Sequence, residues 1–370
     1  MILLSNTHTF ALGQRAYNQR LLVWAGLPVV DACTVDADYG HLLLLTGNGT
    51  LSGVNLDSGA CTELCSVALP ALPYTDSTRR SWPRYGLRAA PDGRHAAIVV
   101  DGGREGVVVD VLTGRPTMRL DGGNYHEDTV PFSACFVSFQ GRNVLVHRTD
   151  WNRLDAADPA IGESLTERDT ESEEAAQVEG RHLDYFHGQL LPSPDGRRLV
   201  DDGWVWHPVS IPRAWSVFDW LSANPWESEY GASAINLTIQ ENWNTPVCWV
   251  GNQHVALWGL ENWDAEEEDV EPTQGPGVRI LDVTERKQSS ERRVAMNLDE
   301  REVIDMFSDG EHLYVAAVTG TTVWHIASGA RIAGFPDFIA RLHHQRRGSL
   351  VAIRPDTIVE FPLPHWGAST

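Results

Sequence analysis

Three features of the sequence predict an all-β fold, a seven-bladed β-propeller of four-stranded antiparallel blades. Turn motifs recur along the chain, a short apolar run follows each turn, and one stretch shows a complete four-stranded unit. That stretch, residues 302–335, places β-branched and aromatic residues between three glycine-containing turns, as half-buried strands do. A meander of this size cannot bury both of its faces alone, so it requires neighbours of the same kind.

Two turn landmarks locate the other units. The second landmark begins with a polar residue, as in the segment from Asp110 to Gly114. In the units where both landmarks carry a glycine, the second glycine follows the first by 19–21 residues. Glycine suits such turns because it adopts left-handed backbone conformations without steric cost. The first landmark recurs at steps of 38–59 residues, with its glycines at Gly40, Gly93, Gly141, Gly196, Gly251, Gly310 and Gly348.

The order of these units predicts how the ring closes. A strand at residues 21–25 precedes the first complete unit, whereas the last unit supplies only three strands. We expect strand 21–25 to pair with the strand near residues 357–361, which removes both open sheet edges. The expected blades cover residues 28–70, 84–121, 131–166, 186–240, 246–297, 302–336, and 338–364 with 21–25, in a single domain over 1–370. Inserted loops are expected at residues 167–185, 209–232 and 261–277.

Blade 4 is the least regular unit. Residues 203–208 are predicted to be its third strand, because their Val-Trp-His triplet repeats that of residues 323–325. Residues 212–224 then predict an inserted helix, with its proline in the first turn and an apolar stripe. The fourth strand follows at residues 234–239. The stripe of this helix would consist of Trp215, Phe218 and Leu221.

The pattern Ser-Pro-Asp-Gly-Arg, followed by an apolar strand and by Val-Trp with a glycine five positions later, resembles a known superfamily. It is similar to the WD-repeat-like β-propellers, especially degenerate bacterial ones, over roughly residues 21–364. The sequence departs from that family where His207 and His325 stand in place of the aspartate of its Trp-Asp dipeptide. The resemblance implies the propeller fold and an interaction domain.

Composition restricts the partners and the compartment. The chain has 29 Lys and Arg against 50 Asp and Glu, a net charge of −21, which disfavours nucleic acid and anionic membranes and favours cationic partners. Five cysteines without framework spacing predict reduced thiols in a cytoplasmic protein. The sequence shows no signal-peptide pattern and no 18-residue apolar segment.

No cofactor, metal or catalytic residue is assigned from the sequence. Cys61 and Cys65 lack a second pair of ligands at suitable spacing, so we expect no stoichiometric zinc. Residues 102–106 predict a hairpin turn rather than a phosphate loop, because they join two strands. No Gly-x-Ser-x-Gly motif occurs, whereas a pair of carboxylates for hydrolysis remains an open alternative that no spacing locates.

Long loops gather on one predicted face of the ring, at residues 70–84, 121–131, 167–185, 240–246 and 261–277. Tryptophan beside carboxylates in these loops suits an Arg- or Lys-bearing peptide. The alternative is that each Trp fills the gap between two blades, and that the acidic runs 167–174 and 266–271 are solvated loops. The candidate partner-binding residues are Trp82, Asp150, Trp151, Glu241, Trp243, Trp263 and Asp264.

These observations favour a non-catalytic interaction scaffold or adaptor, a monomeric propeller that binds a protein or peptide partner through its long-loop face. Trp151 and Trp263 occupy matching positions in blades 3 and 5, so they are expected on the same face. The alternative is a propeller enzyme of lyase, lactonase or glycosidase type, with its site at the mouth of the central channel. The fold alone does not decide between them.

Overall fold

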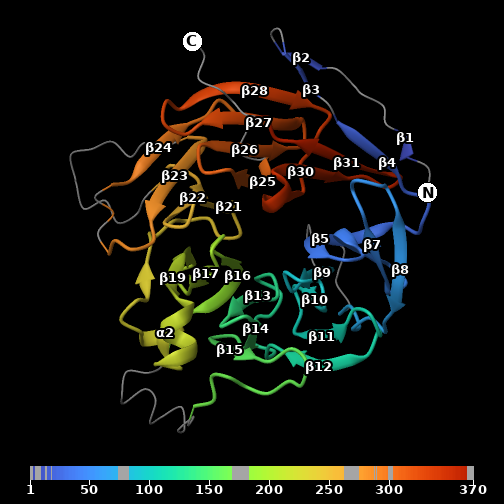
Figure 1. Ribbon diagram of the computed structural model, residues 1–370. Coiled ribbons are helices and arrows are strands. Elements are labelled where there is room, and N and C mark those ends of the chain that lie inside the picture. Colours follow the sequence, from blue (N-terminus) through green and yellow to red (C-terminus); the bar gives the residue numbers. More distant parts are fainter. Residues whose placement is uncertain are drawn as a thin grey trace, which may run out of the picture.

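The computed structural model describes residues 19–73, 83–168, 183–261, 275–286, 288, 290–298 and 303–364, with three short strand segments before residue 19. Seven antiparallel sheets surround a central axis, which confirms the predicted seven-bladed β-propeller (Figure 1). Those three segments are β1 (Leu3–Leu4), β2 (Phe10–Leu12) and β3 (Arg15–Tyr17). β2 pairs with β3 outside the seven blades.

Blades 1 to 3 follow the turn landmarks of the sequence. Blade 1 contains β5 (Val29–Ala37), β6 (Gly40–Thr46), β7 (Thr50–Val54) and β8 (Cys61–Ser66). Blade 2 contains β9 (Arg84–Ala89), β10 (His95–Asp101), β11 (Glu105–Asp110) and β12 (Pro116–Asp121). Blade 3 contains β13 (Ala134–Phe139), β14 (Arg142–Asp150) and β15 (Arg153–Ala157). An isolated bridge between Ala157 and Ser164 forms the outer edge of blade 3.

Blades 5 and 6 keep the same meander. Blade 5 contains β21 (Val247–Val250), β22 (His254–Trp258), β23 (Gly277–Asp282) and β24 (Arg292–Ala295). Most of its expected insertion at 261–277 lies outside the described residues. Blade 6 contains β25 (Val303–Ser308), β26 (His312–Ala317), β27 (Gly320–His325) and β28 (Ala330–Pro336). The glycines of its three predicted turns, Gly310, Gly320 and Gly329, have φ angles of 98°, 130° and 66°.

Blade 4 differs from the prediction. Its strands are β16 (Phe186–Pro192), β17 (Arg198–Val205), the pair β18 (Val209–Ser210) and β19 (Arg213–Ser216), and β20 (Ile235–Asn236). Residues 203–208 are therefore not the third strand, because residues 203–205 end β17 and both β18 and β19 pair with it. The Asp-Asp-Gly sequence within β17 resembles a turn, but Asp201 accepts hydrogen bonds from Gly188 N and His187 Nδ1 and so remains inside the sheet.

The helical insertion of blade 4 begins later than expected. α2 (Val217–Ser222) starts after Ser216, whose Oγ accepts a hydrogen bond from Asp219 N and caps the helix. Its buried residues are Val217 and Trp220, so the expected stripe of Trp215, Phe218 and Leu221 is wrong. A second short helix, α3 (Glu227–Tyr230), completes the excursion. Residues 209–232 thus combine a third strand with two helices rather than one inserted loop.

The N-terminal strand closes the ring as predicted. Blade 7 contains β29 (Leu342–His344), a 3-10 turn η2 (Gln345–Arg347), β30 (Ser349–Ile353) and β31 (Thr357–Pro362). β4 (Arg20–Val23) supplies the fourth strand, pairing antiparallel with β31 from Thr357–Val23 to Glu360–Arg20. This pairing joins the N-terminal strand β4 to the last strand, β31, within one blade.

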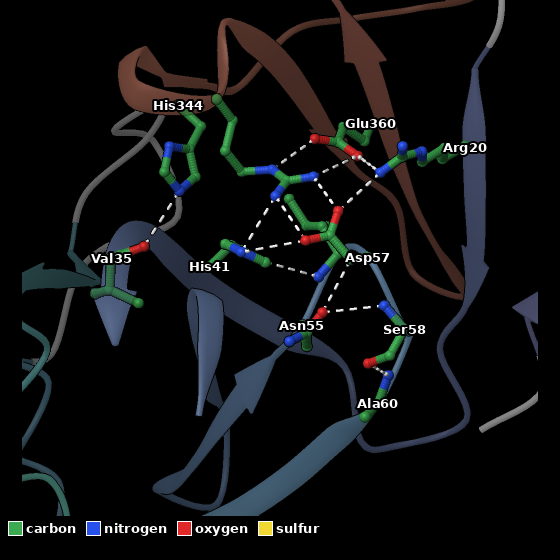
Figure 2. Close-up of polar contacts among 11 residues, drawn as sticks. Arg20, Val35, His41, Asn55, Asp57, Ser58, Ala60, His344 and Glu360 are labelled. Carbon is green, nitrogen blue, oxygen red and sulfur yellow. Dashed lines mark hydrogen bonds and ion pairs between the residues drawn. The ribbon is translucent and has the colours of Figure 1, made fainter. Parts of the chain in front are cut away.

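A network of charged side chains reinforces this closure. Arg347 donates hydrogen bonds to Asp57 of blade 1 (Nη2 to Oδ1, 2.8 Å) and to Glu360 of blade 7 (Nε to Oε1, 2.9 Å). Arg20 Nη1 contacts the same two carboxylates at 3.1 and 3.4 Å, and His41 Nε2 lies 3.1 Å from Arg347 Nη1. Figure 2 shows Arg20 of β4, His41 of β6 and Glu360 of β31 converging with Asp57, which lies in the turn after β7.

Hydrophobic side chains fill the interfaces between neighbouring blades. Leu43 and Leu45 of blade 1, for example, pack with Ile98 and Val109 of blade 2, and all four are fully buried. Comparable clusters occupy the other six interfaces of the ring. Each blade therefore buries both faces against its neighbours, which a single meander cannot do. In the described part of the chain, no helix is long and apolar enough to span a membrane.

The antiparallel meander divides the connections between two faces. The link face carries the turns between second and third strands and the links from blade to blade. The turn face carries the turns between first and second strands and between third and fourth strands. The α2 and α3 helices belong to the turn face, because they connect the third and fourth strands of blade 4.

Candidate functional site

Aromatic side chains from four separate segments meet on the link face at blades 3 and 4. The segments are the link between blades 2 and 3, the central turn of blade 3, the link-face ends of β16 and β17, and the link between blades 4 and 5. We call the group the aromatic cluster. It consists of Tyr125, His126, Trp151, Phe186, Trp204, Trp206 and Trp243.

The end of β17 sets the different exposure of the two central tryptophans. Trp204 lies in β17 and is 2% exposed, whereas Trp206, two residues further on, has left the strand and is 42% exposed. Residues two apart in a regular strand share a face, so the chain must leave the strand after Val205 to bring Trp206 to the surface. Their rings still touch edge to face, with centroids 5.1 Å apart and planes at 81°.

Four rings of the cluster form a stacked column. Trp243 stacks on Trp204 (centroids 5.4 Å apart, planes at 20°), and Trp204 stacks on Phe186 (4.3 Å, 8°). Phe186 in turn stacks on Tyr125 (5.8 Å, 16°). Near-parallel rings at these separations gain about 0.5–1.5 kcal/mol per pair beyond the burial of their area. The column therefore ties two interblade links to the first and second strands of blade 4.

The edge of the column is open to solvent. Tyr125 is 45% exposed, and His126 beside it is exposed as well. The His126 ring meets Tyr125 at 4.6 Å and Trp206 at 5.0 Å, in both cases edge to face. Trp151 is half-buried and packs against Phe186 at 4.7 Å. Buried rings thus support an exposed corner formed by Tyr125, His126 and Trp206.

Backbone contacts fix the two links that carry this corner. His126 and Asn244 both adopt left-handed backbone, with φ angles of 50° and 56°. His126 O accepts hydrogen bonds from Thr129 N and Oγ1 at 3.1 and 2.8 Å. Asn244 Nδ2 donates to Thr129 O at 3.1 Å and joins the two links directly. Non-glycine residues held in left-handed backbone concentrate at functional sites, because the surrounding structure must compensate the strain.

Carboxylates follow the same segments. Asp150, Asp184 and Glu241 are exposed and lie within two residues of Trp151, Phe186 and Trp243, respectively. Glu127 follows His126 and is half-buried. Acidic side chains therefore lie in the same chain segments as the rings of the aromatic cluster.

The structure brings part of the predicted binding set together. Trp151 and Trp243 belong to the aromatic cluster, with Asp150 and Glu241 exposed beside them. Trp82, Trp263 and Asp264 lie outside the described residues. The partner-binding role of all seven residues stays a prediction. The alternative, that each of these tryptophans fills a gap between blades, stays open: Trp151 and Trp243 are half-buried and pack against the buried rings of Phe186 and Trp204.

Five members of the cluster were missed from the sequence: Tyr125, His126, Phe186, Trp204 and Trp206. For Trp204 and Trp206 the cause is the misplaced third strand of blade 4. It assigned them to a strand running toward the turn face, whereas β17 ends at the link face. Tyr125 and His126 lie in the predicted loop 121–131 but were not selected, because only tryptophans beside carboxylates were chosen from these loops. The signal available was the length of β17, since residues 198–205 form one uninterrupted strand once the two aspartates are accepted inside it.

The mouth of the central channel is the second candidate. A cavity of 340 Å³ on the link face is lined by aliphatic residues and by four charged ones, Asp31, Asp337, Arg341 and Arg354. Asp31 accepts a hydrogen bond from Leu87 N at 2.6 Å, and its carboxylate lies 3.6 Å from Arg88. Burial raises the pKa of Asp31, and Arg88 opposes that shift. Among the described residues, no group of three or more His, Cys, Asp or Glu side chains could hold a metal ion.

Comparisons with known proteins place the fold but not the role. No protein-family model and no curated protein matches the sequence. Among solved structures the chain is similar to U3-55K, with 12% identity over 93% of this chain and 98% of that chain and a TM-score of 0.56. It is also similar to the β-propeller domain of Myceliophteria thermophila Cps50 (Swd1), with 10% identity, coverages of 92% and 98%, and a TM-score of 0.53.

A third similar structure is Kuenenia stuttgartiensis hydrazine synthase, with 13% identity, coverages of 90% and 94%, and a TM-score of 0.54. At these identities the likeness shows the β-propeller fold alone. Because one of these proteins is named as an enzyme, the fold does not choose between catalysis and binding. The choice depends on the residues of the site.

Proposed function

We propose that this protein is a non-catalytic scaffold that binds a protein partner on its link face, through the exposed corner of the aromatic cluster. The observation that carries the proposal is the stacked column, which ends in the exposed ring of Tyr125 and supports the exposed ring of Trp206 edge to face. Large exposed rings on a rigid, buried support are typical of binding hot spots, because little conformational entropy is lost when a partner docks.

The partner would present a cationic side chain, preferably Arg. A guanidinium can stack on Tyr125 or Trp206 while it pairs with a neighbouring carboxylate such as Glu127 or Glu241. Each cation–π contact contributes about 0.5–2 kcal/mol, and the exposed charges contribute mainly to the association rate and to specificity. The alternative, an enzyme at the channel mouth, is less well supported because Asp31 in the cavity there is already engaged with Leu87 and Arg88.

The test uses a fluorescein-labelled decapeptide in which Arg alternates with Ala, and an otherwise identical peptide with Gln in place of Arg. We expect the Arg peptide to bind the wild-type protein and the Gln peptide to bind far more weakly. Replacing Tyr125 and Trp206 together by Ser should weaken binding of the Arg peptide by about tenfold or more, as the loss of two cation–π contacts implies.

The matched control replaces Leu112 and Ile161 by Ser, two exposed apolar residues on the turn face that are 52% and 68% exposed. The control variant should melt near the wild-type temperature, because exposed substitutions rarely change stability by more than about 0.5 kcal/mol. The Tyr125 and Trp206 variant loses ring contacts to Phe186, so binding is measured well below its own melting temperature. Equal binding of the two peptides, or unchanged binding by the Tyr125 and Trp206 variant, would refute the proposal. If the peptides bind as expected, affinity purification with the wild type and the same variants identifies the natural partner.

A further inference from the structure

His126 occupies the centre of the exposed corner of the aromatic cluster. Its imidazole ring meets Tyr125 at a centroid distance of 4.6 Å and Trp206 at 5.0 Å, with interplanar angles of 88° and 83°. The same ring lies 6.1 Å from the buried ring of Phe186. A single imidazole therefore contacts both exposed rings that are proposed to receive the cationic side chain of the partner. Any change in the charge of this imidazole acts at the binding site itself.

Backbone contacts hold His126 in this place. Its φ angle of 50° is left-handed, and its carbonyl oxygen accepts two hydrogen bonds from Thr129. Asn244 Nδ2 donates to the carbonyl oxygen of Thr129 at 3.1 Å and ties this turn to the link between blades 4 and 5. The His126 side chain is nevertheless exposed, so water can deliver a proton to its ring. The imidazole is thus fixed in position and open to titration.

The imidazole of His126 has no carboxylate bonded to it, in contrast to other histidines of the chain. His187 Nδ1 lies 2.6 Å from Asp201 Oδ2, and His312 Nδ1 lies 3.1 Å from Asp309 Oδ2. Within the described part of the chain, neither ring nitrogen of His126 makes a hydrogen bond or an ion pair. A proton on His126 therefore adds a positive charge to the exposed corner that no bonded partner cancels.

Imidazole titrates in a different range of pH from the carboxylates of the same surface. Histidine ordinarily gains its proton between about pH 8 and pH 5, whereas carboxylates do so near pH 4. A window from pH 8 to pH 5.5 therefore separates the two kinds of group. A second exposed histidine, His207, follows Trp206 and has to be tested separately. The other ionisable groups on the segments packed against His126 and Tyr125 are Glu127, Asp128, Asp150 and Asp184.

From these features we infer that His126 makes binding on the link face depend on pH. The inference rests on the proposed function, in which the partner brings a cation to the same rings. A neutral imidazole leaves Tyr125 and Trp206 to the guanidinium of the partner, whereas an imidazolium places a second positive charge beside it. Because like charges at contact distance repel, the partner binds at pH 8 and is released as the pH falls toward 5.5.

The experiment measures the affinity of the labelled Arg peptide at pH 8 and at pH 5.5, at constant salt. For the wild type we expect the affinity at pH 5.5 to be about fivefold lower, as one like-charge contact in water implies. His126→Asn removes the titrating group and suits left-handed backbone, so its affinities at the two pH values should differ by less than about twofold. His126→Lys is charged at both pH values and should bind the peptide more weakly than His126→Asn at pH 8.

His207→Asn is the matched control, because His207 is exposed beside Trp206 but is not a member of the aromatic cluster. It removes the same titrating group and should keep the ratio of affinities of the wild type. If the wild type and His126→Asn show the same ratio, or if His207→Asn abolishes the dependence on pH, the inference is overturned while the proposed function stands. If the Arg peptide does not bind the wild type at pH 8, the proposed function fails and the inference fails with it.

Discussion

Two seams of the ring are held together by different chemistry. The seam between blades 7 and 1 joins the chain ends through paired strands and through charged groups around Arg347. The seam at blades 3 and 4 joins neighbouring segments through stacked rings around Trp204. Hydrogen-bonded ion pairs are directional and fix the register of residues far apart in sequence. Ring stacking tolerates more geometries and leaves ring faces and edges exposed, which suits a binding surface.

The largest effect is expected at the aromatic seam, from Trp204→Ala. This change empties a fully buried site in the middle of the column and should lower the free energy of unfolding by about 3–5 kcal/mol. Denaturant titration monitored by circular dichroism measures it. Trp206→Ala, two residues away and 42% exposed, is the matched control and should lower the free energy by less than about 1 kcal/mol. If both variants lowered the free energy of unfolding by similar amounts, the aromatic cluster would not divide into a buried support and an exposed corner.

The next largest effect is expected at the closure seam, from Arg347→Met. The Glu360 side chain is only 2% exposed, so losing Arg347 leaves a buried carboxylate with Arg20 as its remaining cation. Removing one member of such a group should lower the free energy of unfolding by about 2–3 kcal/mol.

Arg346→Met is the matched control for this change, since Arg346 is 76% exposed and its partner Asp36 is 36% exposed. Arg346→Met should lower the free energy of unfolding by about 0.5 kcal/mol or less, as removal of other surface ion pairs does. If the two arginine variants are equally stable, the charged groups contribute little and strand pairing alone closes the ring.

The smallest expected effect is a difference between the seams in how the free energy of unfolding depends on pH. Burial, together with the neighbouring Asp201 charge, raises the pKa of Asp202 in β17 to about 7. The folded state therefore holds a proton that the unfolded state has lost between about pH 4 and pH 7, and stability falls as pH rises through this window. Asp202→Asn should raise the free energy of unfolding by about 1–2 kcal/mol at pH 8, and its advantage should vanish near pH 4.

The closure seam should respond in the opposite sense. Hydrogen bonding to Arg347 lowers the pKa of Asp57 to about 2. The stability from Asp57 is thus present above its unfolded pKa near 4 and is lost as pH falls toward 2. Thermal melting of the wild type, Asp57→Asn and Asp202→Asn between pH 2 and pH 8 checks both directions. Parallel pH profiles for the two variants would show that these carboxylates do not distinguish the seams.

Blade 6 and blade 4 show where prediction from the sequence succeeded and failed. All four strands of blade 6 were predicted, because its turns carry Gly310, Gly320 and Gly329 at positions with left-handed backbone. In blade 4 the Val-Trp-His triplet of residues 205–207 repeats that of blade 6 and predicted a third strand, yet residues 203–205 end β17, the second strand. A repeated triplet cannot reveal which strand it pairs with, so the third strand of blade 4 was misplaced.

By itself the sequence determined the all-β class, the seven units and the closing strand, because turn glycines and strand alternation act over a few residues. It also indicated the link face and two of its residues, Trp151 and Trp243. Tertiary structure alone decided which rings stack, because Tyr125 and Trp243 belong to different links and meet through blade 4. It also decided the third strand of blade 4, since β18 and β19 are defined by their pairing with β17, which has no local signature.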